Sequence, residues 1–246
     1  MLKITLPTQL FMIAGLLFIA MSSCIKSDYF PCQRPRGDVI QERRTIHPLT
    51  QGVNLSLHGE VFVTKGDTPS LTIIAAENLM DHISIRTSGQ DIIIKQDCCI
   101  KAQRSDIQIM ITLPGLNTLE VSGSGMILVE DAFESETMHL AISGSGSIQG
   151  PLSGEELQVG ISGSGRVEIN GEFHHQRVAI SGSGEARNAN VLSQEAQVFI
   201  SGSGNAFVHV AQKLKVVISG SGNTHYYGLP QVSSTISGTG SVIAAN

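Results

Sequence analysis

The feature that most constrains the fold is a four-residue phrase, Ser-Gly-Ser-Gly, which recurs through the second half of the chain. The phrases begin at Ser122, Ser143, Ser162, Ser181, Ser201, Ser219 and Ser237. The last one reads Ser-Gly-Thr-Gly, and successive phrases start 21, 19, 19, 20, 18 and 18 residues apart. Such a period is typical of a solenoid, in which each repeat forms one turn, here called a rung, that stacks on its neighbours.

A β-branched residue precedes every phrase, and a second apolar column lies two residues further upstream. The first column is Val121, Ile142, Ile161, Ile180, Ile200, Ile218 and Ile236. This alternation predicts a strand with one buried face. Continued through the phrase, it places both glycines inward and both serines outward. The glycines are expected where the interior is too narrow for a side chain or where the backbone bends. The sequence therefore predicts an all-β, right-handed, single-stranded parallel β-helix with rungs of 18 to 21 residues.

The N-terminal segment has the pattern of an export signal. Lys3 precedes an apolar run over residues 10–20, which is too short to span a membrane. The run ends in Met-Ser-Ser-Cys24, which resembles the lipobox of bacterial lipoproteins, where the cysteine carries acyl chains such as palmitate. Residues 1–23 are then a lipoprotein signal peptide, and residues 24–37 are a tether. The alternative is an ordinary cleaved signal with Cys24 as a structural cysteine.

Lipidation of Cys24 would hold the protein on a membrane of the bacterial cell envelope. We expect this membrane to be the outer membrane. The sequence does not predict whether the protein lies on its periplasmic face or on its surface face. Three further cysteines remain, and disulfides persist in an oxidising compartment. A disulfide of Cys32 with Cys98 or Cys99 is the favoured interpretation. The adjacent pair Cys98 and Cys99 alone is a poor zinc site, because zinc-binding cysteines are usually separated by at least two residues.

The sequence predicts a β-rich N-terminal cap over residues 38–115. It predicts the Ser-Gly-Ser-Gly solenoid over residues 116–246. Within the cap, residues 53–63 align with the later rungs as a degenerate first rung. Leu55 takes the place of the β-branched residue, and Ser56-Leu57-His58-Gly59 takes the place of the phrase. The other expected strands are residues 39–46, 71–75, 83–87, 91–96 and 106–113, and residues 77–82 are one helical turn.

The order of these motifs resembles a known family. An export signal with a lipobox is followed by the early rung, the turn Thr64-Lys65-Gly66-Asp67, a strand ending in Leu113-Pro114, and the repeated phrases. This order is similar to the head GIN domain family of auto-transporter adhesins. The resemblance implies an envelope protein with a β-helix-like fold and transfers no catalytic motif. The chain departs from the family pattern at Leu57 and His58.

Composition excludes several classes of function. The net charge is −5, and Arg43 with Arg44 is the densest basic pair, so the chain lacks the basic surface of a nucleic-acid-binding protein. Tryptophan is absent, and aromatic residues make up 4% of the chain, which leaves few platforms for stacking sugars or bases. The phrases lack the aspartates of calcium-binding solenoid repeats. We expect no cofactor and no metal.

The two serine columns form hydroxyl ladders that are expected mainly to solvate a flat wall. The plain surface is interrupted near the C-terminus, where the sequence predicts a small patch that could contact a sugar or a protein. Its residues are Phe207, His209, His225, Tyr226 and Tyr227. Here the alternative is a local cap on the last rungs.

The sequence therefore predicts a non-catalytic envelope lipoprotein, an adhesin or a binding or structural protein that displays a rigid solenoid surface. Its partners would be a membrane, through the lipid anchor, and a glycan or surface protein. One alternative is a polysaccharide-active β-helix enzyme, which a groove lined by several acidic residues would favour. Another is a self-polymerising envelope scaffold, joined end to end through exposed solenoid rungs, which an uncovered apolar terminal rung would favour. Arg166 and Glu185, on adjacent rungs, are expected to form an ion pair and not a catalytic pair.

Overall fold

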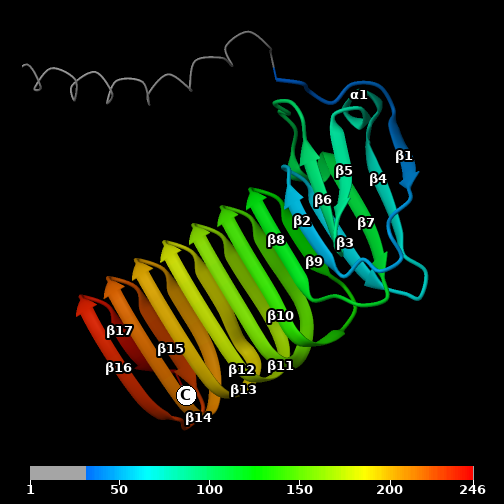
Figure 1. Ribbon diagram of the computed structural model, residues 1–246. Coiled ribbons are helices and arrows are strands. Elements are labelled where there is room, and N and C mark those ends of the chain that lie inside the picture. The colour runs from blue at the N-terminus through cyan, green and yellow to red at the C-terminus, as the bar shows by residue number, and fades with distance from the viewer. Residues whose placement is uncertain (1–31, 246) are drawn as a thin grey trace, which may run out of the picture. The chain divides into compact units, whose positions relative to one another are not determined.

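The computed structural model describes residues 32–245 (Figure 1). The predicted signal peptide, Cys24 and most of the tether lie outside the described residues. Contacts divide the chain into residues 1–32 and residues 33–246, and every element below belongs to the second unit. Within the described part, no helix is long and apolar enough to cross a membrane.

The second half of the chain is the predicted parallel solenoid. Its strands are β8 (Thr118–Gly123), β9 (Met126–Val129), β10 (Phe133–Gly144), β11 (Ser147–Gly163), β12 (Arg166–Gly182), β13 (Glu185–Gly202), β14 (Asn205–Gly220), β15 (Asn223–Tyr227), β16 (Gln231–Gly238) and β17 (Ser241–Ala244). Each pairs in parallel with its counterparts on the neighbouring rungs. The first serines of successive phrases stand in register, as Ser143 does with Ser122 and Ser162. The predicted fold class is confirmed.

Apolar side chains fill the coil in the predicted columns. Ile142, Ile161, Ile180, Ile200 and Ile218 are all at most 2% exposed. After each phrase, inward residues such as Ile148, Val167 and Ala186 continue the core along the opposite strands. Parallel strands buried in this way hold their register through backbone ladders and apolar packing together.

The two glycines of each phrase have different roles, so the prediction that both point inward is wrong for the first one. The first glycine turns the chain at a corner and has a positive φ, for example +117° at Gly163. The second glycine is buried. A Cβ on Gly165 would overlap the Ile142 side chain and come within 2.9 Å of the Gly146 carbonyl oxygen. The corner needs the conformational freedom of glycine, and the interior needs its lack of a side chain.

The cap contains a rung that sequence reasoning missed. The predicted first rung, β2 (Gly52–Ser56) and β3 (Glu60–Lys65), pairs in parallel with β8 and β9, and Leu55 opposes Val121 as expected. On their other side, β2 and β3 pair in parallel with β6 (Asp91–Gln96) and β7 (Ile107–Leu113). Residues 91–113 therefore form the outermost rung, although they follow the first rung in the sequence.

Antiparallel strands cover this end of the coil (Figure 1). β5 (Ile83–Ser88) pairs with β6, and β4 (Ser70–Ala76) pairs with β7. The outer strand β1 (Val39–Arg44) pairs with β4 and carries the Arg43 and Arg44 pair. Charged side chains on an edge strand oppose further strand addition. A short helix, α1 (Glu77–Met80), and a 3-10 helix, η1 (Arg104–Asp106), complete the cap.

The opposite end of the coil is uncovered within the described residues. Every residue of β16 is exposed, and the inward positions Val232 and Ile236 are 37% and 41% exposed. Their counterparts on the preceding rung, Leu214 and Ile218, are each 1% exposed. The two ends of the solenoid therefore differ: one is covered and charged, and the other presents apolar side chains on an edge strand.

Candidate functional site

The outward face of the strands that enter the phrases is hollowed into a shallow groove of about 690 Å³, here called the axial groove. It crosses β8 and β10 to β14. Each strand contributes one outward-facing residue to the floor of the groove. In the middle of the groove these floor residues are small: Ala141, Gly160 and Ala179. Because flanking side chains are longer, the row of small residues forms a depression along the coil.

The walls and ends of the axial groove differ in chemistry. The first serines of the phrases line one wall, from Ser122 to Ser219. Glu120 lies at one end, and Phe199 and Val217 lie at the other. The Arg177 guanidinium lies 4.6 Å from the centre of the Phe199 ring, in a cation–π contact. The groove is thus an apolar channel with hydroxyl groups along one side and a cation beside its aromatic end.

The length of the axial groove follows from the fold. Strands from six rungs line it. Stacked strands are about 4.8 Å apart, which gives a span of about 24 Å. Sequence reasoning did not find this site, because it assigned the wall to solvation. The sequence does contain a signal for this groove. In three successive repeats the residue two positions before the phrase is small: Ala141, Gly160 and Ala179.

The predicted aromatic patch consists of two ring pairs on the outer surface of β14 and β15. Phe207 and His225 are stacked, with ring centroids 4.7 Å apart, and His209 and Tyr227 are tilted at 6.3 Å. Tyr226 differs from the prediction, because it is partly buried and packs against the core. It pairs with the inward Val208, so its direction follows from the strand alternation. The other four residues stay a predicted contact surface.

An acidic hollow of about 890 Å³ lies at the far corners of the rungs. It is lined by Glu134, Glu136, Glu155 and Glu172, together with His174 and Lys65. All four glutamates are exposed. A glycosidase-type acid needs a carboxyl group whose surroundings differ sharply from those of its partner. These solvated carboxylates do not provide that contrast.

The predicted ion pair between adjacent rungs is confirmed. Arg166 Nε lies 3.1 Å from Glu185 Oε2, and Arg187 Nε lies 3.0 Å from the same oxygen. A similar contact joins Lys213 to Glu195 at 2.7 Å, and its hydrogen bond lowers the pKa of the Glu195 carboxyl. These exposed pairs are structural contacts with small individual effects on stability.

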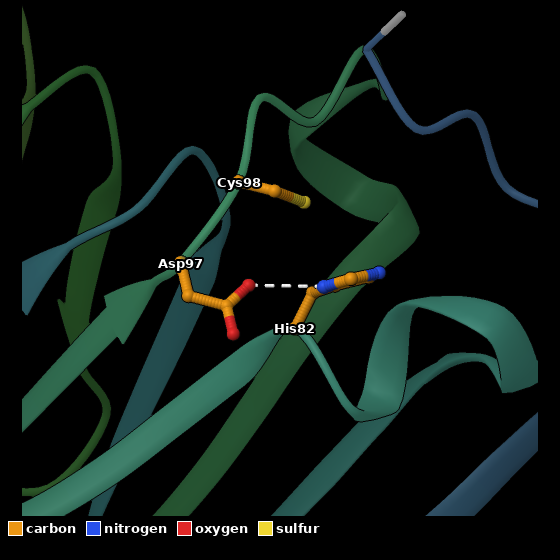
Figure 2. Close-up of side chains that lie close together, drawn as sticks. All are labelled: His82, Asp97 and Cys98. Carbon is orange, nitrogen blue, oxygen red and sulfur yellow. Dashed lines mark hydrogen bonds and ion pairs between the residues drawn. The ribbon is translucent and has the colours of Figure 1, made fainter. Parts of the chain in front are cut away.

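A second cluster of reactive side chains lies in the cap. His82, Asp97 and Cys98 point toward one another at the end of the β5–β6 hairpin (Figure 2). Asp97 accepts a 2.9 Å hydrogen bond at the His82 ring. Burial, and then the neighbouring Asp97 carboxylate, raise the pKa of the Cys98 thiol. Sequence reasoning missed this cluster, which we call the cap cluster.

The cysteines of the cap are in two different states. Cys32 and Cys99 are disulfide-bonded, and Cys98 is a free thiol. Of the two partners predicted for Cys32, Cys98 does not fit, because its thiol is free, and the pairing of Cys32 with Cys99 stays a prediction. The backbone brings their neighbours together: the Gln33 amide donates to the Cys99 carbonyl at 2.8 Å. Lipidation of Cys24 lies outside the described residues.

A long parallel solenoid with a grooved outer wall defines a class of repetitive proteins that display a rigid surface. Residues 51–230 match the family described as "Putative auto-transporter adhesin, head GIN domain", and the chain belongs to that family. The resemblance inferred from the motif order is confirmed. The chain matches no curated protein.

Solved structures share the fold. A "putative adhesin" from Bacteroides fragilis is 19% identical, with a TM-score of 0.78 over 85% of this chain and 98% of that chain. A "Putative lipid binding protein" from Parabacteroides distasonis is 21% identical, with a TM-score of 0.74 over 88% and 100%. A "putative adhesin" from Parabacteroides merdae is 21% identical, with a TM-score of 0.68 over 87% and 99%. The family and these neighbours are named as adhesins or binding proteins and not as enzymes.

Proposed function

We propose that this protein is a non-catalytic binding protein of the bacterial cell envelope, and that its axial groove holds one extended acyl chain. The observation that carries the proposal is the unbroken row of Ala141, Gly160 and Ala179 along the groove floor. A straight apolar ligand can lie against such a floor across successive rungs. The span of about 24 Å is comparable to an extended long-chain fatty acid.

The chemistry of the groove favours an acyl chain over a glycan. A sugar ligand needs convergent hydrogen-bonding groups and aromatic faces to stack on. The floor offers small apolar groups and the single ring of Phe199, and that ring already faces Arg177. The exposed cations Arg177 and Lys215 lie on either side of Gln197, two residues before Phe199 along the strand, and so stand at the same end. A carboxylate or phosphate headgroup would be stabilised there.

Two comparisons support the proposal. The solved structure from Parabacteroides distasonis carries the name of a lipid-binding protein. The family description names an adhesin, which acts by binding at a cell surface. Both descriptions are of proteins that bind at a surface, and the axial groove is an apolar surface feature of the described residues that could serve for binding.

The experiment is an equilibrium titration of the purified protein with fatty acids of different length. Palmitate is expected to bind in the micromolar range, and octanoate at least about tenfold more weakly, because each buried CH₂ contributes up to about 0.8 kcal/mol. The alcohol of the same length as palmitate should bind more weakly, since it lacks a charge to pair with Arg177 or Lys215. Affinity for oligosaccharides without any dependence on chain length would contradict the proposal.

The proposal places the protein on the envelope through a lipid attached to Cys24. Its support is the lipobox-like sequence before Cys24 and the adhesin description of the family. Acyl chains at this position would anchor the solenoid stably. Incorporation of labelled palmitate in cells should be lost in Cys24→Ala; label that persists in this variant would contradict the anchor.

A second candidate function, self-association, is favoured by the uncovered last rung. β16 pairs only with β14 among the described strands, and residues 228–246 contain no charged side chain. An exposed edge strand without charges is a template for pairing with another chain. Because the other end of the coil is covered, two copies would join by their last rungs as a closed dimer and would not polymerise.

Sedimentation of the purified protein tests this second candidate. We expect a concentration-dependent dimer, and Ile236→Lys should weaken dimerisation by about tenfold or more, because it buries an unpaired charge in the contact. Thr235→Lys is the matched control, since Thr235 lies on the outward side of the same strand. A monomer at all concentrations, or equal effects of both variants, would contradict the dimer.

A further inference from the structure

We propose that the cap cluster of His82, Asp97 and Cys98 is a zinc-binding site (Figure 2). Each residue offers one ligand atom, and these atoms all lie within 4.8 Å of one another. The three donors are an imidazole nitrogen, a carboxylate oxygen and a thiol sulfur. The site is in the cap and is independent of the axial groove proposed for the acyl chain.

The β5–β6 hairpin brings the three ligands together without a metal. Ile83 opposes Gln96 at the end of the antiparallel pair, so the residues just beyond them, His82 and Asp97, are also neighbours. The Asp97 amide donates a 3.1 Å hydrogen bond to the His82 carbonyl. Their side chains meet at 2.9 Å, between His82 Nδ1 and Asp97 Oδ1. Backbone pairing thus fixes two ligands on the same side of the hairpin.

The third ligand is held by the segment that follows β6. Cys98 is half-buried and packs against the core, and its carbonyl accepts a hydrogen bond from Gln96. Next to it, the Cys99 carbonyl accepts from the Gln33 amide at 2.8 Å, and the Lys101 amide donates to the Gln33 carbonyl at 2.7 Å. A thiol on a segment tied down on both sides is pre-positioned for binding.

The donor set selects the class of metal. Calcium and magnesium require oxygen ligands, whereas zinc accepts nitrogen, oxygen and sulfur together. Zinc bonds of about 2.0 to 2.3 Å in a tetrahedron place ligand atoms about 3.3 to 3.8 Å apart. The present separations, 2.9 Å between His82 Nδ1 and Asp97 Oδ1 and at most 4.8 Å within the cluster, lie on either side of this range. Three protein ligands leave a fourth position for water or an outside ligand.

Binding has a defined proton balance. The zinc–sulfur bond forms as the Cys98 thiol loses its proton to solvent. Zinc binds Asp97 in its carboxylate form, so this ligand adds no proton to the balance. For His82 to bind through Nδ1, the Nδ1 proton that is donated to Asp97 must exchange with solvent while Nε2 takes one up, so the ring stays neutral and this tautomer change releases no net proton. One proton is therefore released for each zinc ion. The His82 and Asp97 side chains are 32% and 58% exposed, so the ion can reach the site from solvent.

Cobalt(II) titration of the purified protein under non-reducing conditions is the first test. One equivalent should produce a thiolate-to-cobalt charge-transfer band, which zinc then abolishes by displacement. Cys98→Ser should remove this band. In a chelator competition, His82→Ala should weaken zinc binding by at least about tenfold, because one of three ligands is lost.

His174→Ala is the matched control. His174 is also an exposed histidine beside a carboxylate, 3.2 Å from Glu155, but it belongs to the acidic hollow. Its replacement should leave zinc affinity unchanged. The unfolding midpoint measured without metal should be the same in Cys98→Ser and the unmodified protein. Absence of the charge-transfer band, or equal zinc affinity in Cys98→Ser and the unmodified protein, would overturn the proposal.

Discussion

Replacing Gly163 by alanine is expected to lower the free energy of unfolding by about 3 to 5 kcal/mol. Gly163 turns the chain at a corner with φ of +117°, a conformation that costs a residue with a side chain about 1 to 3 kcal/mol. The added Cβ would also lie 2.5 Å from the Gly144 carbonyl oxygen. That oxygen accepts a 2.9 Å hydrogen bond from the Ser164 amide, so relief of the overlap would disturb the ladder between two rungs.

Gly160→Ala is the control for this effect. Gly160 lies only three residues earlier, on the groove floor, where a Cβ would have no neighbour closer than 4.0 Å. Its replacement should change the free energy of unfolding by no more than about 0.5 kcal/mol. Denaturant unfolding of the two variants measures the difference. Equal stability of Gly163→Ala and Gly160→Ala would show that the corner does not require glycine.

The second large effect is expected on binding. Gly160→Trp should lower the affinity for palmitate by at least about tenfold, because an indole at the centre of the floor occupies the path of the chain. The fold should tolerate this variant, since a Cβ at this position would have no neighbour closer than 4.0 Å and aromatic residues favour strands. Fluorescence titration against Gly160→Ala measures the loss.

The matched alanine variant separates blockage from a general disturbance of the strand. A single methyl group leaves the groove open, so Gly160→Ala should bind palmitate within about threefold of the unmodified protein. The unfolding midpoints of all three proteins should agree closely. Full affinity in Gly160→Trp would mean that palmitate binds elsewhere.

The solenoid could be predicted because its constraints are local and repeated. Each rung carries a β-branched residue followed by the same two glycines, so the spacing of the phrases fixes both the strand and its register. The different roles of the glycines could not be predicted from alternation alone. Alternation describes a straight strand, and the positive φ of residues such as Gly163 interrupts it at a corner.

The rung formed by β6 and β7 was missed because sequence order does not determine stacking order. Ile92 and Ile94 are buried and Ile93 between them is partly exposed, as in any half-buried strand. That pattern does not show that the chain turns back so that β2 lies between β6 and β8. The cap cluster was missed for a related reason. His82 and Asp97 are 15 residues apart, and only the register of the hairpin places them side by side.

The axial groove was missed because small residues form it, whereas sequence reasoning looked for reactive side chains. Ala141, Gly160 and Ala179 carry no functional group, and their significance appears only when the rungs are stacked. Sequence reasoning favoured the aromatic residues near the C-terminus because such side chains suggest contacts. Phe207 and His225 instead stack on each other on the outer surface of β14 and β15.

Photo-crosslinking with a diazirine-bearing palmitate tests the central claim most directly, because it reports where the acyl chain lies. The proposal predicts crosslinks to peptides that contain the floor residues Ala141, Gly160 and Ala179 and the end residue Phe199, with competition by unmodified palmitate. Crosslinks confined to the Phe207 and His225 surface, to the acidic hollow or to the last rung would contradict it.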